Sequence, residues 1–251
     1  MSVSKQLWML SAGNWGGPGM HLRGNIEAFL RASSQDKWLS MHVGTHFESF
    51  YLPHYVAMQK RFFDHFLKGC DNGWEREPRV SIEVRRPGGS ARRAHATFPF
   101  ERTQWTKLYL DAGAGSIGAA NPATASQMRF DALGDGVSFA TAPFASDTEL
   151  TGFVTLRLNV SSSTTDMDLF ATLRMFDASG REVIFVGAHE PVPVARGWLR
   201  VSHRKIDPVM STPYRVFRAH DAIEIAAGSA WRALSNHSAL SATAPVASSA
   251  A

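Results

Sequence analysis

The chain has 251 residues, of which 44% are hydrophobic and 19% charged, and this composition excludes a disordered polypeptide. Its formal net charge of +4 is mild, and the densest arginine cluster surrounds a turn at residues 87–90, so we expect no nucleic-acid partner. No stretch approaches the roughly 20 apolar residues that span a bilayer, and the single cysteine, Cys70, excludes an intrachain disulfide.

The first third of the chain has the pattern of an α/β unit. The short apolar run 7–10 ends in a glycine-rich loop at 11–19. Helical spacing follows over 25–32, and residues 37–43 alternate like a strand that stops at Gly44. Strand, helix and strand in this order predict a βαβ unit in a parallel sheet.

The segment 52–67 is the strongest predicted helix. Six apolar side chains give it a broad face: Val56, Met58, Phe62, Phe63, Phe66 and Leu67. Gly69 stands where a helix is expected to stop.

Beyond residue 73 the pattern changes to short strands. Strict alternation occurs over 80–84 and 107–111, and turn residues separate further candidates at 128–130, 137–141, 153–160, 169–176, 183–186 and 198–202. Strands of this length and spacing predict an antiparallel sandwich or barrel.

These patterns divide the chain into three predicted parts. Residues 1–74 form the α/β part, and 75–225 form the β part. Residues 226–251, rich in alanine and serine, form a tail that we expect to be disordered.

Two patterns that suggest a bound group have simpler interpretations. Residues 113–118 match G-x-G-x-x-G, but Pro122 argues against the helix that a dinucleotide site needs, so we interpret them as an inter-strand loop. Asp166 and Asp168 lack the further oxygen ligands that calcium requires. We therefore expect no cofactor and no metal.

His46 is the candidate catalytic residue. It follows an apolar strand and Gly44, in a loop that precedes the strongest helix. Catalytic groups in open α/β sheets lie at the carboxyl ends of strands, where a histidine can take a proton from a serine hydroxyl. The alternative is that His46 is a polar loop residue without a catalytic role.

Several segments together resemble cocaine-esterase-like hydrolases, which belong with the X-Pro dipeptidyl-peptidases. In the α/β part these segments are 13–17 (GNWGG), 21–25 (HLRGN) and 59–69 (QKRFFDHFLKG). In the β part they are 138–141 (SFAT), 147–152 (DTELTG), 166–170 (DMDLF) and 197–204 (GWLRVSHR). The resemblance extends over roughly residues 7–220.

The resemblance implies the C-terminal segment of an α/β-hydrolase domain followed by a mainly β jelly-roll sandwich, truncated at both ends. It implies a serine esterase or dipeptidyl-peptidase-like hydrolase that acts on ester or amide bonds, either acyl or X-Pro dipeptidyl, in a small-molecule ester or peptide substrate. The single cysteine, Cys70, separately favours a reducing, cytoplasmic compartment. His46 matches the catalytic histidine, and Gly16 or Gly17 stands where the acid of the triad is expected.

The chain departs from this family in lacking a G-x-S-x-G nucleophile, which the family carries upstream of residue 1. A sheet without its earlier strands exposes an edge, so we expect self-association through exposed sheet edges. Two alternatives to a hydrolase stay open. One is a binding module, in which Trp105, Trp198 and Trp231 stack on carbohydrate, and the other is an oligomerisation module.

Overall fold

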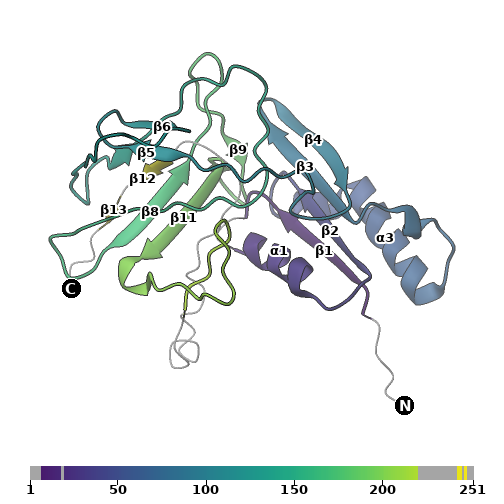
Figure 1. Cartoon of the computed structure of the whole chain (residues 1–251). Coiled ribbons are helices and arrows are strands. Elements are labelled where there is room, and N and C mark those ends of the chain that lie inside the picture. Colours follow the sequence, from purple (N-terminus) through teal and green to yellow (C-terminus); the bar gives the residue numbers. More distant parts are fainter. Residues whose placement is uncertain (1–6, 18–19, 220–241, 245, 248–251) are drawn as a thin grey trace. The chain divides into compact units, whose positions relative to one another are not determined.

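The structure, a computed structural model, describes residues 7–17, 20–219, 242–244 and 246–247 (Figure 1). The chain divides into two compact units. We call residues 1–103 with 185–192 the α/β unit, and residues 104–184 with 193–251 the β unit. Among the described residues, no helix is both long and apolar enough to cross a membrane.

A sheet of four strands forms the α/β unit. In spatial order these strands are β1 (Met9–Asn14), β2 (Lys37–His42), β3 (Val80–Arg86) and β4 (Gly89–His95). The first three are parallel and β4 returns antiparallel to β3. The predicted βαβ unit is confirmed, because a helix connects β1 to its parallel neighbour β2.

Four helical segments accompany this sheet: α1 (Leu22–Arg31), α2 (Glu48–Tyr51), α3 (Pro53–Lys68) and the 3-10 turn η1 (Trp74–Arg76). The helix α1 buries Leu22, Ile26 and Phe29, which recur at the spacing of one helix face. The helix α3 ends at Gly69, whose φ of 68° is left-handed, as the sequence predicts.

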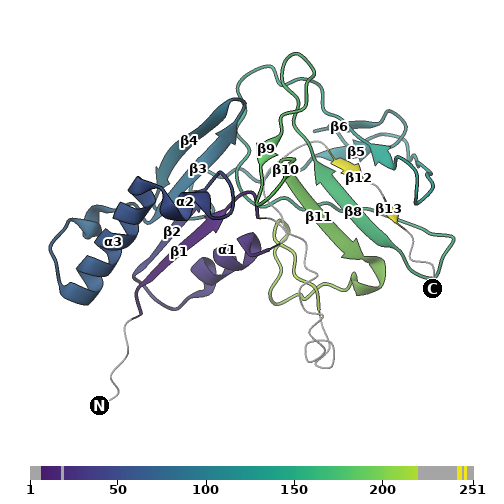
Figure 2. The ribbon, with the colours of Figure 1, turned by 180° about the vertical axis from the view of Figure 1, so that it is seen from behind.

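The two long helices cover opposite faces of the sheet (Figure 2). Gly13 and its register partner Met41 face Asn25 of α1. Side chains alternate between the two faces along a strand. The even-numbered residues Leu10 and Trp38 therefore lie on the opposite face, toward α3. On that side Trp38, Phe62 and Trp74 form a buried aromatic cluster.

The α/β unit continues beyond residue 74, where the sequence predicts its end. The predicted strand 80–84 is present as part of β3, but it pairs with β2 in parallel. With β4 it therefore completes the α/β sheet, and the compact unit extends to Thr103. Alternation along a strand reports one buried face and does not identify the sheet that the strand joins.

A short hairpin from far along the chain also belongs to this unit. It consists of β9 (Phe185–Val186) and β10 (Pro191–Val192), which pair antiparallel. Figure 2 shows both strands. The predicted strand at 183–186 is thus present only in its second half.

The β unit is built from strands and irregular segments. Its elements are β5 (Tyr109–Asp111), β6 (Ser116–Gly118), β7 (Val137–Ser138), β8 (Asp168–Leu173), β11 (Ala195–Arg200), the 3-10 turn η2 (Val201–His203), β12 (Ala242–Ala244) and β13 (Val246–Ala247). The strands β5 and β6 form one hairpin, and β11, β8, β12 and β7 lie side by side in that order, with β13 also on β8.

Several predictions for this part differ from the structure. Residues 128–130 and 153–160 adopt no strand. Most of the tail predicted to be disordered, 226–241 with 245 and 248–251, lies outside the described residues. Within it, β12 and β13 are strands, and pairing with β7 and β8 supplies the order that their alanine-rich sequence does not suggest.

Candidate functional site

His46 lies in the loop that leaves the carboxyl end of β2. The strand ends at His42, and Gly44, with φ of 94°, reverses the chain before His46. In the parallel register His42 is the partner of Asn14, the last residue of β1. The carboxyl ends of two neighbouring parallel strands therefore meet beside this loop, as the sequence predicts.

Asn14 holds the loop in place. Its side chain is 1% exposed, and its Nδ2 donates to the carbonyl oxygens of Gly44 at 3.0 Å and Thr45 at 3.2 Å. Its Oδ1 accepts from the backbone N–H of Gly16 at 2.6 Å. One buried amide thus joins the loop after β1 to the two residues that precede His46.

The ring of His46 packs against other rings. The centroid of His21 is 4.8 Å away, and that of Phe47 is 4.6 Å away in an edge-on arrangement. The Nδ1 atom of His46 is buried and has no hydrogen-bond partner among the described residues. Burial, first, and then the imidazoles of His21 and His189 lower the pKa of His46, so the ring is neutral at pH 7.

The β9–β10 hairpin approaches the same loop through Gly16. Ala188 donates its N–H to the carbonyl of Gly16 at 3.2 Å and accepts from the N–H of His46 at 3.5 Å. A Cβ on Gly16 would lie 2.7 Å from both the Cα of Gly187 and the carbonyl oxygen of Val186. The hairpin thus occupies the space that an acidic side chain at position 16 would need.

Gly17 has more room than Gly16. A Cβ there would lie 3.5 Å from the carbonyl oxygen of Asn14 and 3.8 Å from Cε1 of His21, which are ordinary contacts. Of the two positions that the sequence suggests for an acid, only position 17 can accept one without moving the backbone. Both hold glycine, so neither supplies a carboxylate to His46.

A polar network beneath the loop was missed by sequence reasoning. Ser49 Oγ lies 2.7 Å from Nδ1 of His42, and the hydroxyl of Tyr55 donates to Oε1 of Glu83 at 2.6 Å. Ser49 is only 2% exposed, so its hydroxyl cannot reach a substrate. The network anchors α2 to the end of β2 and α3 to the middle of β3. No spacing rule joins residues from four elements, which explains why it was missed.

Two of these groups have strongly shifted pKa values. Burial, opposed by the charge of Glu83, lowers the pKa of His42 to about 4. Burial and the hydrogen bond to Glu83 raise the pKa of Tyr55. Both side chains are therefore neutral at pH 7, and Glu83 is the charged member, with Ser90 and Arg92 as further donors.

The other two sequence patterns lie in the β unit. Residues 113–118 form the turn and second strand of the β5–β6 hairpin, with no helix, as expected. Asp168 pairs with Arg200, and Asp166 accepts from Ser202. Among the described residues no group of three or more His, Cys, Asp or Glu side chains could hold a metal ion.

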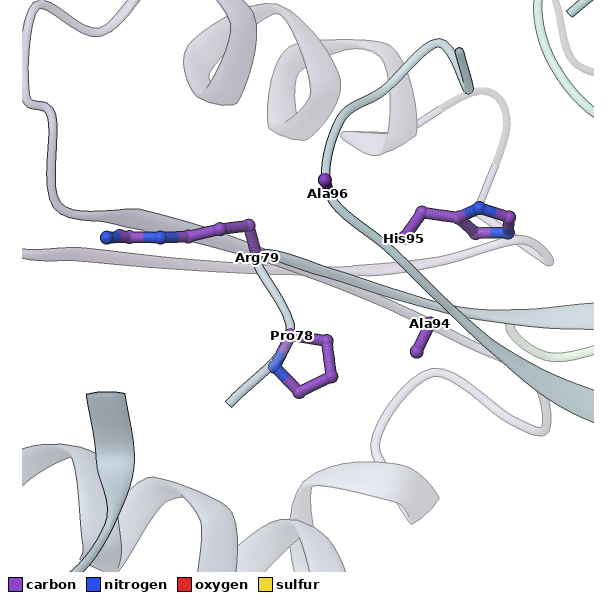
Figure 3. A pocket seen from close by; sticks show the side chains of 5 residues that line it. All are labelled: Pro78, Arg79, Ala94, His95 and Ala96. Carbon is purple, nitrogen blue, oxygen red and sulfur yellow. The ribbon is translucent and has the colours of Figure 1, made fainter. Parts of the chain in front are cut away.

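A surface hollow of about 360 Å³ lies at the ends of β3 and β4 (Figure 3). Its lining consists of Pro78, Arg79, Ala94, His95 and Ala96. Arg79 and His95 extend away from each other, and each already has an aromatic partner, Trp38 and Phe100 respectively. The hollow contains none of the residues around His46.

The chain matches known proteins in two comparisons. Residues 72–211 match the X-Pro dipeptidyl-peptidase C-terminal non-catalytic domain. Two crystal structures of a CocE/NonD family hydrolase from Staphylococcus aureus share 29% and 28% sequence identity with the chain, at TM-scores of 0.83 and 0.82. No curated protein matches.

The matches differ in how much they cover. Each crystal structure covers 96% of this chain, but the chain covers only 46% of that hydrolase. The chain therefore spans less than half the length of these solved structures. The family match extends over more than half of the 251 residues. The resemblance found in the sequence is confirmed. The chain is similar to a CocE/NonD family hydrolase, and it belongs to the family of the X-Pro dipeptidyl-peptidase C-terminal domain.

Proposed function

We propose that this chain supplies the general base, His46, to a serine-hydrolase site that cleaves ester or amide bonds. The α/β unit would be the closing segment of an α/β-hydrolase domain, and the β unit its jelly-roll companion. The position of His46 supports this proposal, because the residue follows the carboxyl end of β2 and lies beside the end of β1. Ligands and catalytic groups of open parallel sheets gather at that edge.

The chemistry follows from what His46 can and cannot do. A neutral imidazole can accept the proton of a serine hydroxyl through Nε2 as the oxygen attacks a carbonyl, and can return it to the leaving group. The hydroxyl and the oxyanion donors would come from polypeptide outside these 251 residues, since the chain contains no G-x-S-x-G sequence. Acyl esters and X-Pro dipeptidyl amides are both candidate substrates, in a cytoplasmic setting.

The buried Nδ1 of His46 is consistent with a site in which this chain supplies the base but not the other catalytic groups. In a serine triad this atom donates to a carboxylate that stabilises the imidazolium. Here the atom has no partner among the described residues, and positions 16 and 17 hold no carboxylate. Because no described carboxylate bonds this atom, the proposal names no residue of this chain as the triad acid.

The test combines this chain with a second polypeptide that would supply the nucleophile. The chain is mixed with the half of the Staphylococcus aureus hydrolase that it does not cover, and fluorophosphonate labelling and p-nitrophenyl ester turnover are measured. We expect both signals in the mixture, and a loss of at least about 100-fold in His46→Gln. His203→Gln, which alters a histidine in the β unit, is the control. Equal activity in His46→Gln and the control would refute the proposal.

A second candidate function rests on the family match, whose domain is described as non-catalytic. The β unit would then be a binding module. Trp105 stacks on Tyr214, with centroids 3.6 Å apart, so one of its faces is already occupied. Trp231 lies outside the described residues. Binding of a glycan that Trp198→Ala abolishes, with the fold retained, would favour this function.

A further inference from the structure

His21 and Asn25, the two polar ends of the segment 21–25, form a side-chain pair at the start of α1. His21 is the N-cap of this helix, and its carbonyl oxygen accepts from the backbone N–H of Asn25 at 2.9 Å. Residues four apart on a helix lie on the same face. The Nδ1 atom of His21 accordingly lies 3.0 Å from the Oδ1 atom of Asn25, which is a hydrogen-bond distance.

The amide of Asn25 determines which nitrogen of His21 carries the proton. Its Nδ2 atom donates to the carbonyl oxygen of Ala12 at 2.8 Å, so its Oδ1 atom is the one that faces His21. An amide oxygen only accepts hydrogen bonds, so the Nδ1 atom of His21 must be the donor. In the neutral ring, a proton on Nδ1 leaves a lone pair on Nε2. His21 therefore keeps its Nε2 atom as a hydrogen-bond acceptor.

The ring of His46 contacts the ring of His21. Their centroids are 4.8 Å apart, and their planes are tilted by 43°. Two imidazoles joined by an N–H···N hydrogen bond have centroids about 5 Å apart, because the bond adds about 3 Å to the two ring radii. In the described part of the chain, the other ring on His46 is that of Phe47, which contains no nitrogen. His21 is thus the polar ring within reach of His46.

The Nδ1 atom of His46 needs an acceptor if this residue is to act as a base. A histidine that takes a proton through Nε2 carries its own proton on Nδ1, and a buried N–H group is normally hydrogen-bonded. This Nδ1 atom is buried and has no hydrogen-bond partner among the described residues. Positions 16 and 17 hold glycine, so they provide no carboxylate for it.

Two further imidazoles lie near enough to act on this site electrostatically. His189, on the β9–β10 hairpin, is exposed and lowers the pKa of His46, as His21 also does. No ring contact joins His189 to His46 among the described residues. His42 is already bonded to the hydroxyl of Ser49 at 2.7 Å. His21 is therefore the imidazole best placed to accept from His46.

We propose that His21 is a positioning residue whose Nε2 atom accepts the Nδ1–H of His46, where a serine triad has a carboxylate. This inference rests on the proposed function and deepens it by naming the partner of the general base. Asn25 fixes the tautomer of His21, and His21 in turn fixes that of His46, with the lone pair on Nε2. Catalytic hydrogen bonds are often loose in a free site and tighten with substrate, so a small turn of the His46 ring completes this one.

Each proton in the acyl-transfer step then has a defined place. As the serine oxygen bonds to the carbonyl carbon, its proton moves to Nε2 of His46, and the ring becomes an imidazolium. The Nδ1 proton stays on His46 and is donated to Nε2 of His21. When the tetrahedral intermediate collapses, the Nε2 proton passes to the leaving group. A neutral acceptor stabilises the imidazolium less than a carboxylate does, which agrees with the lowered pKa of His46.

The test measures the two tautomers in the full chain without substrate. The chain is labelled with ¹⁵N-histidine and observed by NMR at pH 8, where an unperturbed imidazole is neutral. We expect the proton on Nδ1 in both His21 and His46. In His21→Phe, which keeps a ring but no nitrogen, the ratio of the His46 tautomers should shift about ten-fold toward Nε2–H, which corresponds to one hydrogen bond. His21→Gln retains an acceptor and should restore the ratio.

His189→Phe is the matched control. It makes the same change at the competing imidazole and should leave the tautomer ratio of His46 unchanged. His21 and His189 are both exposed, so neither substitution removes a side chain from the core. In the mixture with the uncovered half of the Staphylococcus aureus hydrolase, His21→Phe should lower kcat about ten-fold at unchanged KM, and His21→Gln should recover most of it.

The outcomes separate this inference from the proposed function. An Nε2–H tautomer of His46 in the native chain would overturn it, as would a ratio that His189→Phe shifts and His21→Phe does not. Ester turnover that His21→Phe leaves unchanged would overturn the positioning role even if the tautomers shift. Because the tautomers are measured in the chain alone, absence of turnover in the mixture would count against the proposed function and not against the pairing of His21 with His46.

Discussion

The Nδ2 atom of Asn14 lies 3.0 Å from the carbonyl oxygen of Gly44, and this hydrogen bond ties the end of β1 to the loop that carries His46. The same amide reaches Thr45, one residue before the imidazole. The position of His46 thus depends on a buried polar contact between two neighbouring parallel strands, and removing that contact should change both stability and loop order.

Asn14→Ala should destabilise the α/β unit by about 2 kcal/mol, because it leaves the buried N–H of Gly16 without its acceptor and the part-buried carbonyls of Gly44 and Thr45 without their donor. Native-state hydrogen exchange of the β2 amides measures this change. Asn121→Ala, at an exposed position, should shift stability by less than about 0.5 kcal/mol. Equal protection in both variants would contradict the role assigned to Asn14.

Gly17→Asp should raise the pKa of His46. The new Cβ makes ordinary contacts and lies 3.8 Å from Cε1 of His21, whose ring packs on that of His46. A carboxylate in this position favours the protonated imidazole. Titration of the His46 ring by NMR measures the change, and Gly17→Asn, of nearly the same size but uncharged, is the control. An unchanged or lower pKa in Gly17→Asp would refute this geometry.

Gly16→Asp should instead displace the β9–β10 hairpin. The Cβ would lie 2.7 Å from two backbone atoms of that hairpin, which cannot rotate away as a side-chain end can. We expect a cost of about 1–3 kcal/mol, typical of overpacking, and loss of exchange protection at the amide of Ala188. Retained protection at that amide would show that the hairpin does not need the glycine.

Stability should fall as the pH drops from about 6.5 to about 4. The pKa of His42 is about 4 in the folded protein and 6.5 in the reference state, so the unfolded chain binds a proton in this range and the folded chain does not. The loss attributable to His42 is about 2 kcal/mol once solvent screening is allowed for.

Urea unfolding at several pH values measures this dependence. The pKa of His46 is also lowered, so its contribution has the same sign. His42→Gln should therefore reduce the slope between pH 4 and 6.5 without abolishing it. An identical slope in His42→Gln and the native protein would show that burial does not suppress protonation of this ring.

Tyr55→Phe should destabilise the α/β unit by about 1.5–3 kcal/mol, since the hydroxyl donates to the ionised Glu83 at 2.6 Å. Chemical denaturation measures the loss. Tyr51→Phe removes the corresponding hydroxyl from a side chain that is 71% exposed, and should leave the free energy of unfolding unchanged. Similar losses in both variants would indicate a general effect of the hydroxyl and not the buried contact.

The sequence predicted an element best where a periodic apolar pattern was followed by a residue that ends that element. The helix predicted over 52–67 and ended by Gly69 is α3, because its apolar face and its left-handed glycine are both local properties. The βαβ order of the first third is also local, and the structure confirms it. For His46, a place after a strand end was enough to indicate where it would lie.

The remainder depended on contacts between distant residues. The alternation in 80–84 could not reveal that β3 would join β2, and no signal indicated that 185–192 would leave the β part for the α/β unit. The role of Asn14 was also missed, because its partners lie 30 and 31 residues away. Only the structure could show that a side chain at position 16 would collide with the β9–β10 hairpin, whereas position 17 has room for one.

The hairpin that touches Gly16 and His46 gives the chain an interleaved connectivity. The α/β unit is assembled from residues on both sides of an intervening stretch of the β unit, so no single peptide-bond cleavage separates the two units intact. A protein shortened at Thr103 would lose Ala188, and with it the backbone partner of both Gly16 and His46. Separate expression of the first unit therefore requires grafting residues 185–192 back onto it.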